Sequence, residues 1–231
     1  MDFFETVKKR RSIRRFKADA FPDEMVEKAF EAAVLAPNSS NTQTWDFHWV
    51  KTPEKKKKLI YACMDQSPAR TASHLIVATI GTGKWRRAQK PLIGWVRSIT
   101  APKKVILYYE KLLPYIYTVG LFNILAPLRW LFFNCVNLLK PIMRGPYTDR
   151  DLQEIAIKSS ALACENFVLA ISAQGGATCM MEGFDEWRVK RVLGLGWNDR
   201  VVMVIGVGYE SERGTWGPQF RLPIGDVVHK H

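Results

Sequence analysis

Residues 36–45 read APNSSNTQTW, and the chain on either side of this stretch predicts how it is held. A helix is expected before it, at 23–35, because Pro22-Asp23-Glu24 is a typical helix start. A strand is expected after it, at 46–51. The short polar side chains between them suit contacts with the polar edge of a heterocycle or with a ribityl chain. The same stretch also suits a simple helix cap and turn.

The pattern continues outward as helices alternating with short strands. Further helices are predicted at 2–10, 53–62, 150–173 and 185–193, and further strands at 75–80, 177–181 and 201–207. Short β-branched strands separated by helices predict a central sheet covered by helices. No repeat of fixed period is visible, and a length of 231 residues suits one domain with a sizeable core or two small ones.

The composition is that of a folded protein. The chain has 231 residues, 47% of them hydrophobic and 24% charged, which excludes disorder as its main state. Its formal net charge of +12 is typical of a protein with an anionic partner, such as nucleic acid, an anionic membrane surface or a phosphorylated ligand.

The excess charge is local. Residues 84–147 hold eleven basic side chains and one acidic one, Glu110, whereas the remainder of the chain holds 23 basic and 21 acidic side chains. Within this segment, residues 105–143 are strongly apolar and aromatic, and 112–128 carry no charge. Pro114, Gly120 and Pro127 interrupt that run, which disfavours a simple transmembrane helix. The segment is expected either to be buried among protein partners or to dip into a lipid interface.

Cysteine and histidine usage argues against a metal site. No C-x-x-C pair occurs among the four cysteines, and only His229 and His231 are close together in sequence. We expect reduced, mostly buried thiols and no metal. The N-terminus lacks the apolar core of a secretory signal, which predicts a cytoplasmic protein, with peripheral membrane association as an alternative.

A second motif, residues 10–16, reads RRSIRRF. In an extended segment Arg10, Ser12 and Arg14 point the same way and could converge on one anion, because guanidinium forks bind phosphate bidentately. A solvated basic N-terminus is the alternative. A third motif, Glu182-Gly183-Phe184, ends a predicted strand, and Gly183 allows its backbone N–H to approach a ligand closely.

Together with Arg221-Leu222-Pro223, these motifs resemble, in order and spacing, the FMN-dependent nitroreductase family. The resemblance covers about residues 2–83 and 148–225. It implies a single FMN-binding domain over residues 1–231 with an α+β fold, a three-layer α-β-α sandwich with a mostly antiparallel central sheet. It also implies a homodimer with two FMN sites at the subunit interface and a swapped C-terminal tail, which would explain a tail with no partner in its own chain. The segment at about 84–147 would be an extended lid insertion.

The resemblance also assigns cofactor-binding residues. Arg10, Arg11, Ser12 and Arg14 would hold the phosphate, ribityl and pyrimidine side of FMN, with Arg14 near the flavin N1/O2 edge. The side chains that would contact the flavin of the partner subunit are those of Pro37, Asn38, Ser39, Asn41 and Gln43. Glu182 and Gly183 would place backbone N–H groups near N5 and O4, and Arg221 would join the phosphate site. Two departures from the family pattern are Gln219, where many relatives have a basic residue, and Thr44, where proline is commoner.

The family mechanism is ping-pong: NAD(P)H reduces the bound FMN, leaves, and an electron acceptor replaces it. This needs no dedicated catalytic acid, and no catalytic side chain is predicted. An apolar lid rimmed by basic residues favours a lipophilic acceptor, such as a quinone, nitroaromatic or enone, taken from a membrane surface. The alternative for the lid is ordinary packing on the partner subunit.

Two other functional classes stay open. The nitroreductase-like superfamily includes members that are not reductases of this kind, namely dehalogenases, flavin-cleaving proteins and flavin carriers. Nucleic-acid binding is the remote alternative, suggested by Lys55-Lys56-Lys57-Lys58, but no recognised module is present and the run is typical of a solvated helix face.

Overall fold

The computed structural model describes residues 2–120 and 123–231. Its four strands are β1 (Trp45–Val50), β2 (His74–Gly81), β3 (Ala177–Met181) and β4 (Asp199–Gly208). The helices of the main body are α1 (Phe3–Lys9), α2 (Asp23–Val34), α3 (Pro53–Ala62), α4 (Ser67–Thr71), α9 (Asp149–Ala173) and α10 (Glu186–Leu193).

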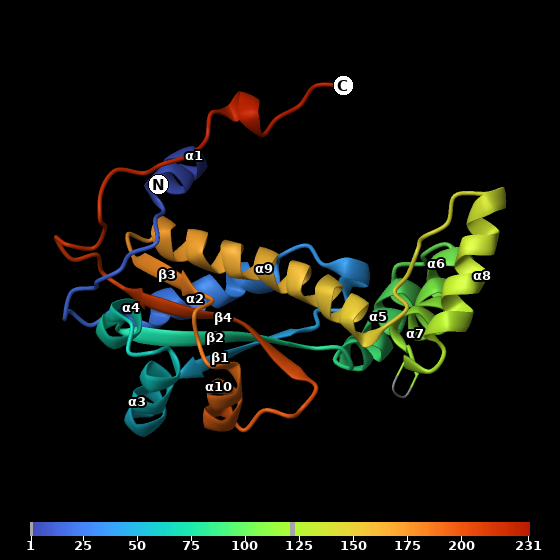
Figure 1. Cartoon of the computed structure of the whole chain (residues 1–231), viewed down its shortest axis with the longest axis horizontal. Helices are drawn as coiled ribbons and strands as arrows, with labels where there is room; N and C mark the ends of the chain where they lie inside the picture. The colour runs from blue at the N-terminus through green and yellow to red at the C-terminus, as the bar shows by residue number, and fades with distance from the viewer. Residues whose placement is uncertain (1, 121–122) are drawn as a thin grey trace.

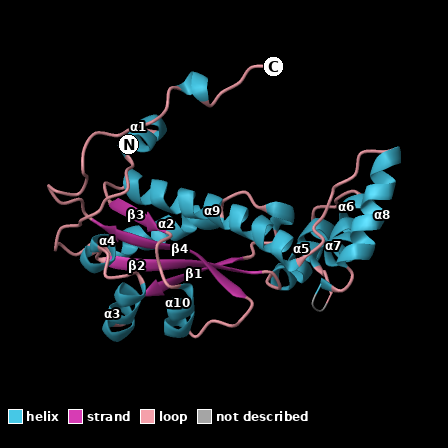
Figure 2. Cartoon of the chain, viewed as in Figure 1, coloured by secondary structure: helices cyan, strands magenta, loops and turns pink. Residues whose placement is uncertain are grey.

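The strands form one antiparallel sheet in the order β1-β2-β4-β3. Figure 2 shows this sheet between helices on its two faces. At the outer edge, Ser12 forms a parallel bridge with Thr178 of β3, which brings the N-terminal arginine motif alongside the sheet. The predicted α+β class and three-layer arrangement are confirmed.

Each face of the sheet has its own hydrophobic core. On one face Ile76 of β2 packs with Val26 of α2 and Phe167 of α9, all three fully buried. On the other face Val77, the next residue of β2, packs with Leu59 of α3. Because successive strand side chains point to opposite faces, one strand serves both cores.

Helix α9 packs beside α2 on the face of the sheet that carries Ile76. Its start is fixed by a capping box, in which the Thr148 side chain accepts a hydrogen bond from the Asp151 N–H and the Asp151 carboxylate accepts from the Thr148 N–H. Among the described residues it is the one helix long and apolar enough to cross a membrane by length and composition, and half of its most apolar window is buried within the protein. Its packing against the sheet accounts for that apolar character.

The predicted lid segment is helical and forms one end of the molecule (Figure 1). It contains α5 (Trp85–Ser98), α6 (Lys103–Leu107), a π-helical turn at Tyr108–Leu112, α7 (Leu113–Tyr117) and α8 (Ala126–Leu139). A small core of its own is centred on Trp85, Leu113 and Tyr117 and includes Leu152 of α9. The tail after β4 contains one short helical turn, η4 (Ile224–Asp226), and runs away from the body to the C-terminus.

Candidate functional site

Four arginines meet in one cavity of about 290 Å³ between the N-terminal segment and the start of the tail. The predicted residues that line it are Arg10, Arg11, Ser12, Arg14 and Arg221. Among the described residues, no aspartate or glutamate lines this cavity. A concave site with several guanidinium groups and a hydroxyl is suited to a phosphate or another compact anion.

Tail residues fix the arginines in place. Arg11 Nη2 donates a hydrogen bond of 2.7 Å to the backbone oxygen of Gly217. The Arg14 guanidinium carbon lies 5.5 Å from the centre of the Trp216 ring, and Arg14 Nη1 lies 3.7 Å from the sulfur of Cys179 on β3. The expectation that the tail has no partner in its own chain is therefore wrong for its first residues, because the extended arginine motif leaves a surface against which they pack.

Gln219, the departure from the family pattern, orients the last arginine. With its amide placed to satisfy both neighbours, Gln219 donates to the backbone oxygen of Lys8 (3.3 Å) and accepts from Arg221 Nη2 (3.2 Å). A further contact holds Arg10, whose Nε lies 3.7 Å from the Glu165 carboxylate of α9.

The Glu182-Gly183 pair follows directly on β3, three and four residues beyond Cys179. Gln66 Nε2 donates a 2.6 Å hydrogen bond to the carbonyl oxygen of Gly183. Both residues are exposed, and within the described chain neither backbone N–H donates a hydrogen bond. The strand thus places two free N–H donors roughly 10 Å beyond the contact of Arg14, at about 3.3 Å per extended residue.

The loop at 36–45 has a strained backbone. Ser40, Asn41 and Gln43 all have positive φ, at 54°, 53° and 46°. Non-glycine residues rarely adopt this region, and it persists only where the surroundings enforce it. One enforcing contact is local, because Asn38 Oδ1 accepts a 2.9 Å hydrogen bond from the Gln43 N–H. Pro37 beside them is exposed.

The lid and α9 supply the other contacts of this loop. Tyr117 of α7 donates its hydroxyl to Ser39 Oγ at 3.0 Å, and the Tyr108 hydroxyl lies 2.5 Å from Ser40 Oγ. Ser159 Oγ of α9 accepts from the Ser39 N–H at 3.3 Å. The loop and the lid therefore form one hydrogen-bonded unit.

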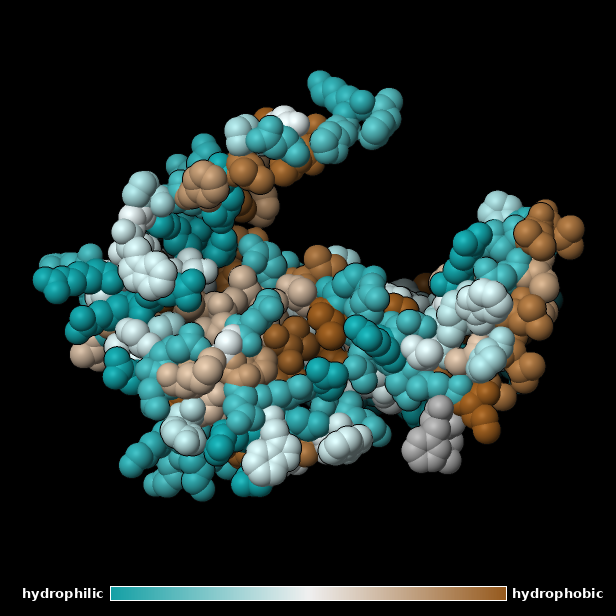
Figure 3. Space-filling model, in the orientation of Figure 1, coloured by the Kyte–Doolittle hydropathy of each residue, from teal (hydrophilic) through white to brown (hydrophobic). Residues whose placement is uncertain are grey.

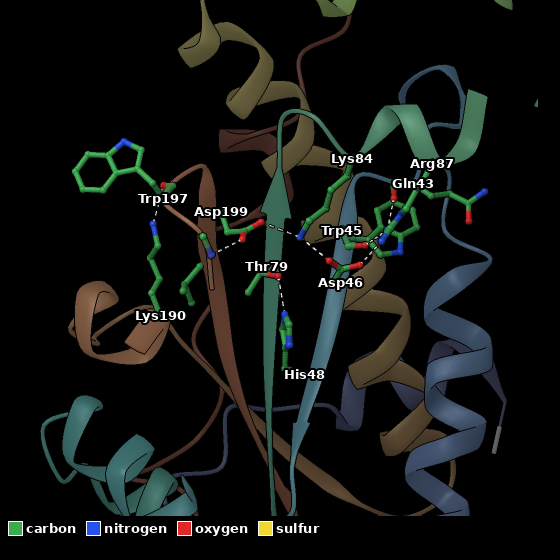
Figure 4. Close-up of polar contacts among 12 residues, drawn as sticks. Gln43, Trp45, Asp46, His48, Thr79, Lys84, Arg87, Lys190, Trp197 and Asp199 are labelled. Carbon is green, nitrogen blue, oxygen red and sulfur yellow. Dashed lines mark hydrogen bonds and ion pairs between the residues drawn. The ribbon is translucent and has the colours of Figure 1, made fainter. Parts of the chain in front are cut away.

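Charged side chains at the start of the lid tie it to the sheet (Figure 4). Lys84 Nζ lies 2.5 Å from the Asp46 carboxylate of β1 and 3.1 Å from that of Asp199 on β4. Burial opposes ionisation of Asp46, but hydrogen bonds from Lys84 and Arg87 outweigh it and hold the pKa of this carboxyl below its ordinary value.

Arg87 of α5 extends this clamp to the loop. Its guanidinium pairs with Asp46 and donates to the backbone oxygens of Gln43, at 2.7 Å, and Trp45. In the sequence, Lys84 and Arg87 stand out only as members of the basic segment 84–147. Their partners are 38 or more positions away in sequence, so no local signal identifies them.

The lysine run on α3 was expected to be a solvated helix face, and for Lys56 this expectation is wrong. Lys56 Nζ donates to the backbone oxygens of Ala72 and Ser73, at 2.7 and 2.9 Å, and burial lowers its pKa. A larger cavity of about 890 Å³ lies between α3 and α10, but no predicted site residue lines it. Within the described ranges, no cluster of three or more His, Cys, Asp or Glu could hold a metal.

The predicted residues thus form three groups. The arginines line one cavity, Glu182 and Gly183 follow the end of β3, and the loop residues lie against the lid and do not line that cavity. A comparison of the sequence with family models matches residues 7–209 to the nitroreductase family. The chain belongs to the nitroreductase family.

Individual relatives agree with this assignment. A Streptococcus pyogenes protein named for NAD(P)H nitroreductase activity is 28% identical, with all of both chains covered. An iodotyrosine deiodinase of Nematostella vectensis is 22% identical over 98% of this chain and 74% of its own length.

Solved nitroreductase-family structures share the fold. One from Exiguobacterium sibiricum, described as a complex with FMN, has a TM-score of 0.74 at 21% identity and covers 100% of this chain and 98% of its own. An enone reductase of gut-bacterial fatty acid saturation has a TM-score of 0.71 at 18% identity, covering 95% and 93%.

Proposed function

We propose that this nitroreductase-family protein is an FMN-dependent oxidoreductase that passes hydride from NAD(P)H to a lipophilic acceptor. The observation that carries the proposal is the cavity in which Arg10, Arg11, Arg14 and Arg221 converge with no acidic side chain in its lining. Four like charges in one concavity repel one another, which suits a site stabilised by a bound anion.

The donors present fit FMN. The arginine cavity would hold the phosphate. The free N–H groups of Glu182 and Gly183, directly after the end of β3, would meet the edge of the flavin ring, which needs donors. The strained loop supports a binding role for its residues, because such strain is concentrated at functional sites.

A homodimer explains why the loop at 36–45 lies apart from the arginine cavity. The loop would complete the site of a second copy, while the arginines serve the site of their own chain. Exposed apolar residues favour such a partner: Phe4 of α1 is 70% exposed, Leu162 of α9 48%, and Ile224 of the tail 77%.

Bound FMN would supply the hydride chemistry, and the protein would supply position, electrostatics and access. Arg14 would place positive charge beside the ring, where it favours the reduced form. Tyr117 and Tyr108 would hold the loop residues against the cofactor through Ser39 and Ser40. The lid would limit the entry of water and shape the space left for the acceptor.

A lipophilic acceptor, such as a quinone, nitroaromatic or enone, suits the lid. A groove of about 430 Å³ between α7 and α8 is lined largely by apolar side chains, among them Leu125, Leu128 and Phe132. The enone reductase among the structural neighbours supports an acceptor of this kind. The deiodinase relatives favour a second candidate, reductive removal of halogen from an aromatic substrate.

Anaerobic reduction tests the proposal. NADH or NADPH should bleach the visible absorption of the FMN-loaded protein, and an added quinone should restore it. Failure of both nicotinamides to bleach the flavin would defeat the reductase proposal. Release of halide from a halogenated phenol under reducing conditions, without turnover of quinone, would favour the second candidate.

A further inference from the structure

Helix α8 has its apolar side on the outside. Its exposed positions include Leu128, Leu131, Phe132, Cys135, Leu138 and Leu139. Their spacing of three, four, seven, ten and eleven residues from the first places them in one stripe along the helix, about 16 Å long at 1.5 Å per residue. Leu138 is 86% exposed and Leu139 90% exposed.

The side of α8 that faces α7 carries a buried charge. Arg129 is only 7% exposed, its Nη2 donates to the backbone oxygen of Tyr115, and its guanidinium carbon lies 4.7 Å from the Tyr115 ring. A surface helix of a soluble protein turns its apolar face inward and its charges outward. Helix α8 does the reverse, so exposure of its outer face to water is energetically unfavourable.

The same end of the molecule is strongly basic. Four of the eleven basic lid residues have their charge paired or buried within the chain: Lys84, Arg87 and Arg97 form ion pairs, and Arg129 is buried. The exposed remainder are Arg86, Lys90, Lys103, Lys104, Lys111, Lys140 and Arg144. Glu110, the one acidic lid residue, pairs with Arg97. Figure 3 shows hydrophobic atoms along α8, at the end of the molecule away from the sheet.

We propose that the outward face of α8 docks in the interface of an anionic lipid bilayer. An apolar stripe flanked by lysines and arginines is the pattern of helices that lie in the plane of that interface. A second copy of the chain is the competing occupant, but its own lid carries the same positive charge, whereas anionic headgroups complement it.

Docking would place the groove between α7 and α8 next to the bilayer, so that an acceptor could enter it from the lipid. This inference rests on the proposed function. Leu128 and Phe132 belong both to the stripe and to the groove between α7 and α8. An acceptor dissolved in the bilayer could therefore move from the lipid into the groove without crossing water. Tyr117 is the last residue of α7, one of the two helices that form the groove, and its hydroxyl donates a hydrogen bond to Ser39 of the loop.

Cys135 allows a direct test, because it lies in the stripe and the other three cysteines are buried. An environment-sensitive maleimide fluorophore attached to it should shift to the blue when vesicles of phosphatidylcholine and phosphatidylglycerol are added. Lipids with a spin label on the acyl chain should then quench its emission. No change on adding vesicles would overturn the proposal. So would a thiol that cannot be labelled in the native protein, because a second copy would then cover α8.

Substitutions distinguish vesicle binding through the α8 stripe from non-specific adsorption of exposed apolar residues. L131S/L138S/L139S should lower the affinity for anionic vesicles roughly tenfold or more, since it removes three large apolar side chains from the contact. The control W187S/W197S removes two exposed aromatic side chains outside the lid, one on α10 and one in the turn before β4, and should bind as the unaltered chain does. Equal binding by the two variants, or equal binding to vesicles without phosphatidylglycerol, would contradict docking through α8 on an anionic surface.

Activity measurements test the groove step alone. The triple variant should reduce a water-soluble quinone at the normal rate and lose turnover of a long-chain quinone held in vesicles. If NAD(P)H fails to bleach bound flavin at all, the proposed function fails while the vesicle result still stands. If both quinones are reduced normally, the transfer of acceptor from the bilayer is refuted.

Discussion

Arg11 donates a hydrogen bond of 2.7 Å to the backbone oxygen of Gly217, although the two residues lie 206 positions apart. This contact closes the arginine cavity by fixing the start of the tail against the N-terminal motif. The cavity therefore depends on residues near both ends of the chain, and the start of the tail forms part of its wall.

The arginine cavity should distinguish FMN from riboflavin by the phosphate group of FMN. R14A and R221A are each expected to weaken FMN binding tenfold or more, because a hydrogen bond to a charged group contributes about 1.5–3 kcal/mol. Binding of riboflavin, which lacks the phosphate, should change much less in R221A. Fluorescence titration with both flavins measures this. R15A, whose exposed side chain does not line the cavity, is the matched control, and equal losses in R15A and R221A would refute a phosphate site.

The lid should control the loop through Tyr117. Y117F removes the hydroxyl that donates to Ser39 Oγ, at a cost of about 1 kcal/mol for a neutral hydrogen bond. FMN affinity should fall by several-fold with little change in the thermal midpoint of the fold. Y115F lies on the same helix and its hydroxyl makes no hydrogen bond among the described residues, so it should bind normally. Identical affinities for the two variants would show that the lid does not position the loop.

The clamp on Asp46 predicts a dependence on pH. Its pKa lies below the ordinary value of 3.8, so its contribution to stability is fully present above that pH and is lost as the pH falls through the lowered value. Unfolding by denaturant should show D46N less stable than the unaltered chain by a constant amount from about pH 5 upward. The difference should shrink below pH 3.8. E212Q, on an exposed carboxylate, should show no such difference, and a D46N deficit that persists in acid would contradict the clamp.

Thiol chemistry should distinguish one cysteine. Burial raises the pKa of Cys63 to about 11 and that of Cys164 to about 12, and burial also raises the pKa of Cys179. Only the thiolate reacts readily with a disulfide reagent, so at neutral pH the native chain should yield one reactive thiol, that of Cys135. Spectrophotometric titration and mapping of the labelled peptide would check this. Two or more fast thiols would show that the cores are open.

Secondary structure in the body follows closely from the sequence. The helix at 53–62 and the strand at 177–181 have the predicted bounds, because a proline start and a short, mostly apolar run between glycines are strong local signals. Helix α4, five residues long, was not predicted, since a single turn has too few residues to show a period. The lid forms several short helices that its continuous apolar pattern does not separate.

The candidate site was only partly accessible from the sequence. The arginines and the loop appear as local motifs. In contrast, the clamp of Lys84 and the hydroxyl of Tyr117 act on residues that are brought near only by the fold. Likewise, sequence could not show that Arg129 turns inward while Leu138 turns outward, because residues of α8 are apolar on nearly every side.

The decisive measurement is the absorption spectrum of the purified protein during titration with FMN. We expect a yellow protein, or a colourless one that binds one FMN per chain, and a mass in solution of two chains per particle. A preparation that is colourless and takes up no FMN at any concentration would refute FMN binding by this chain.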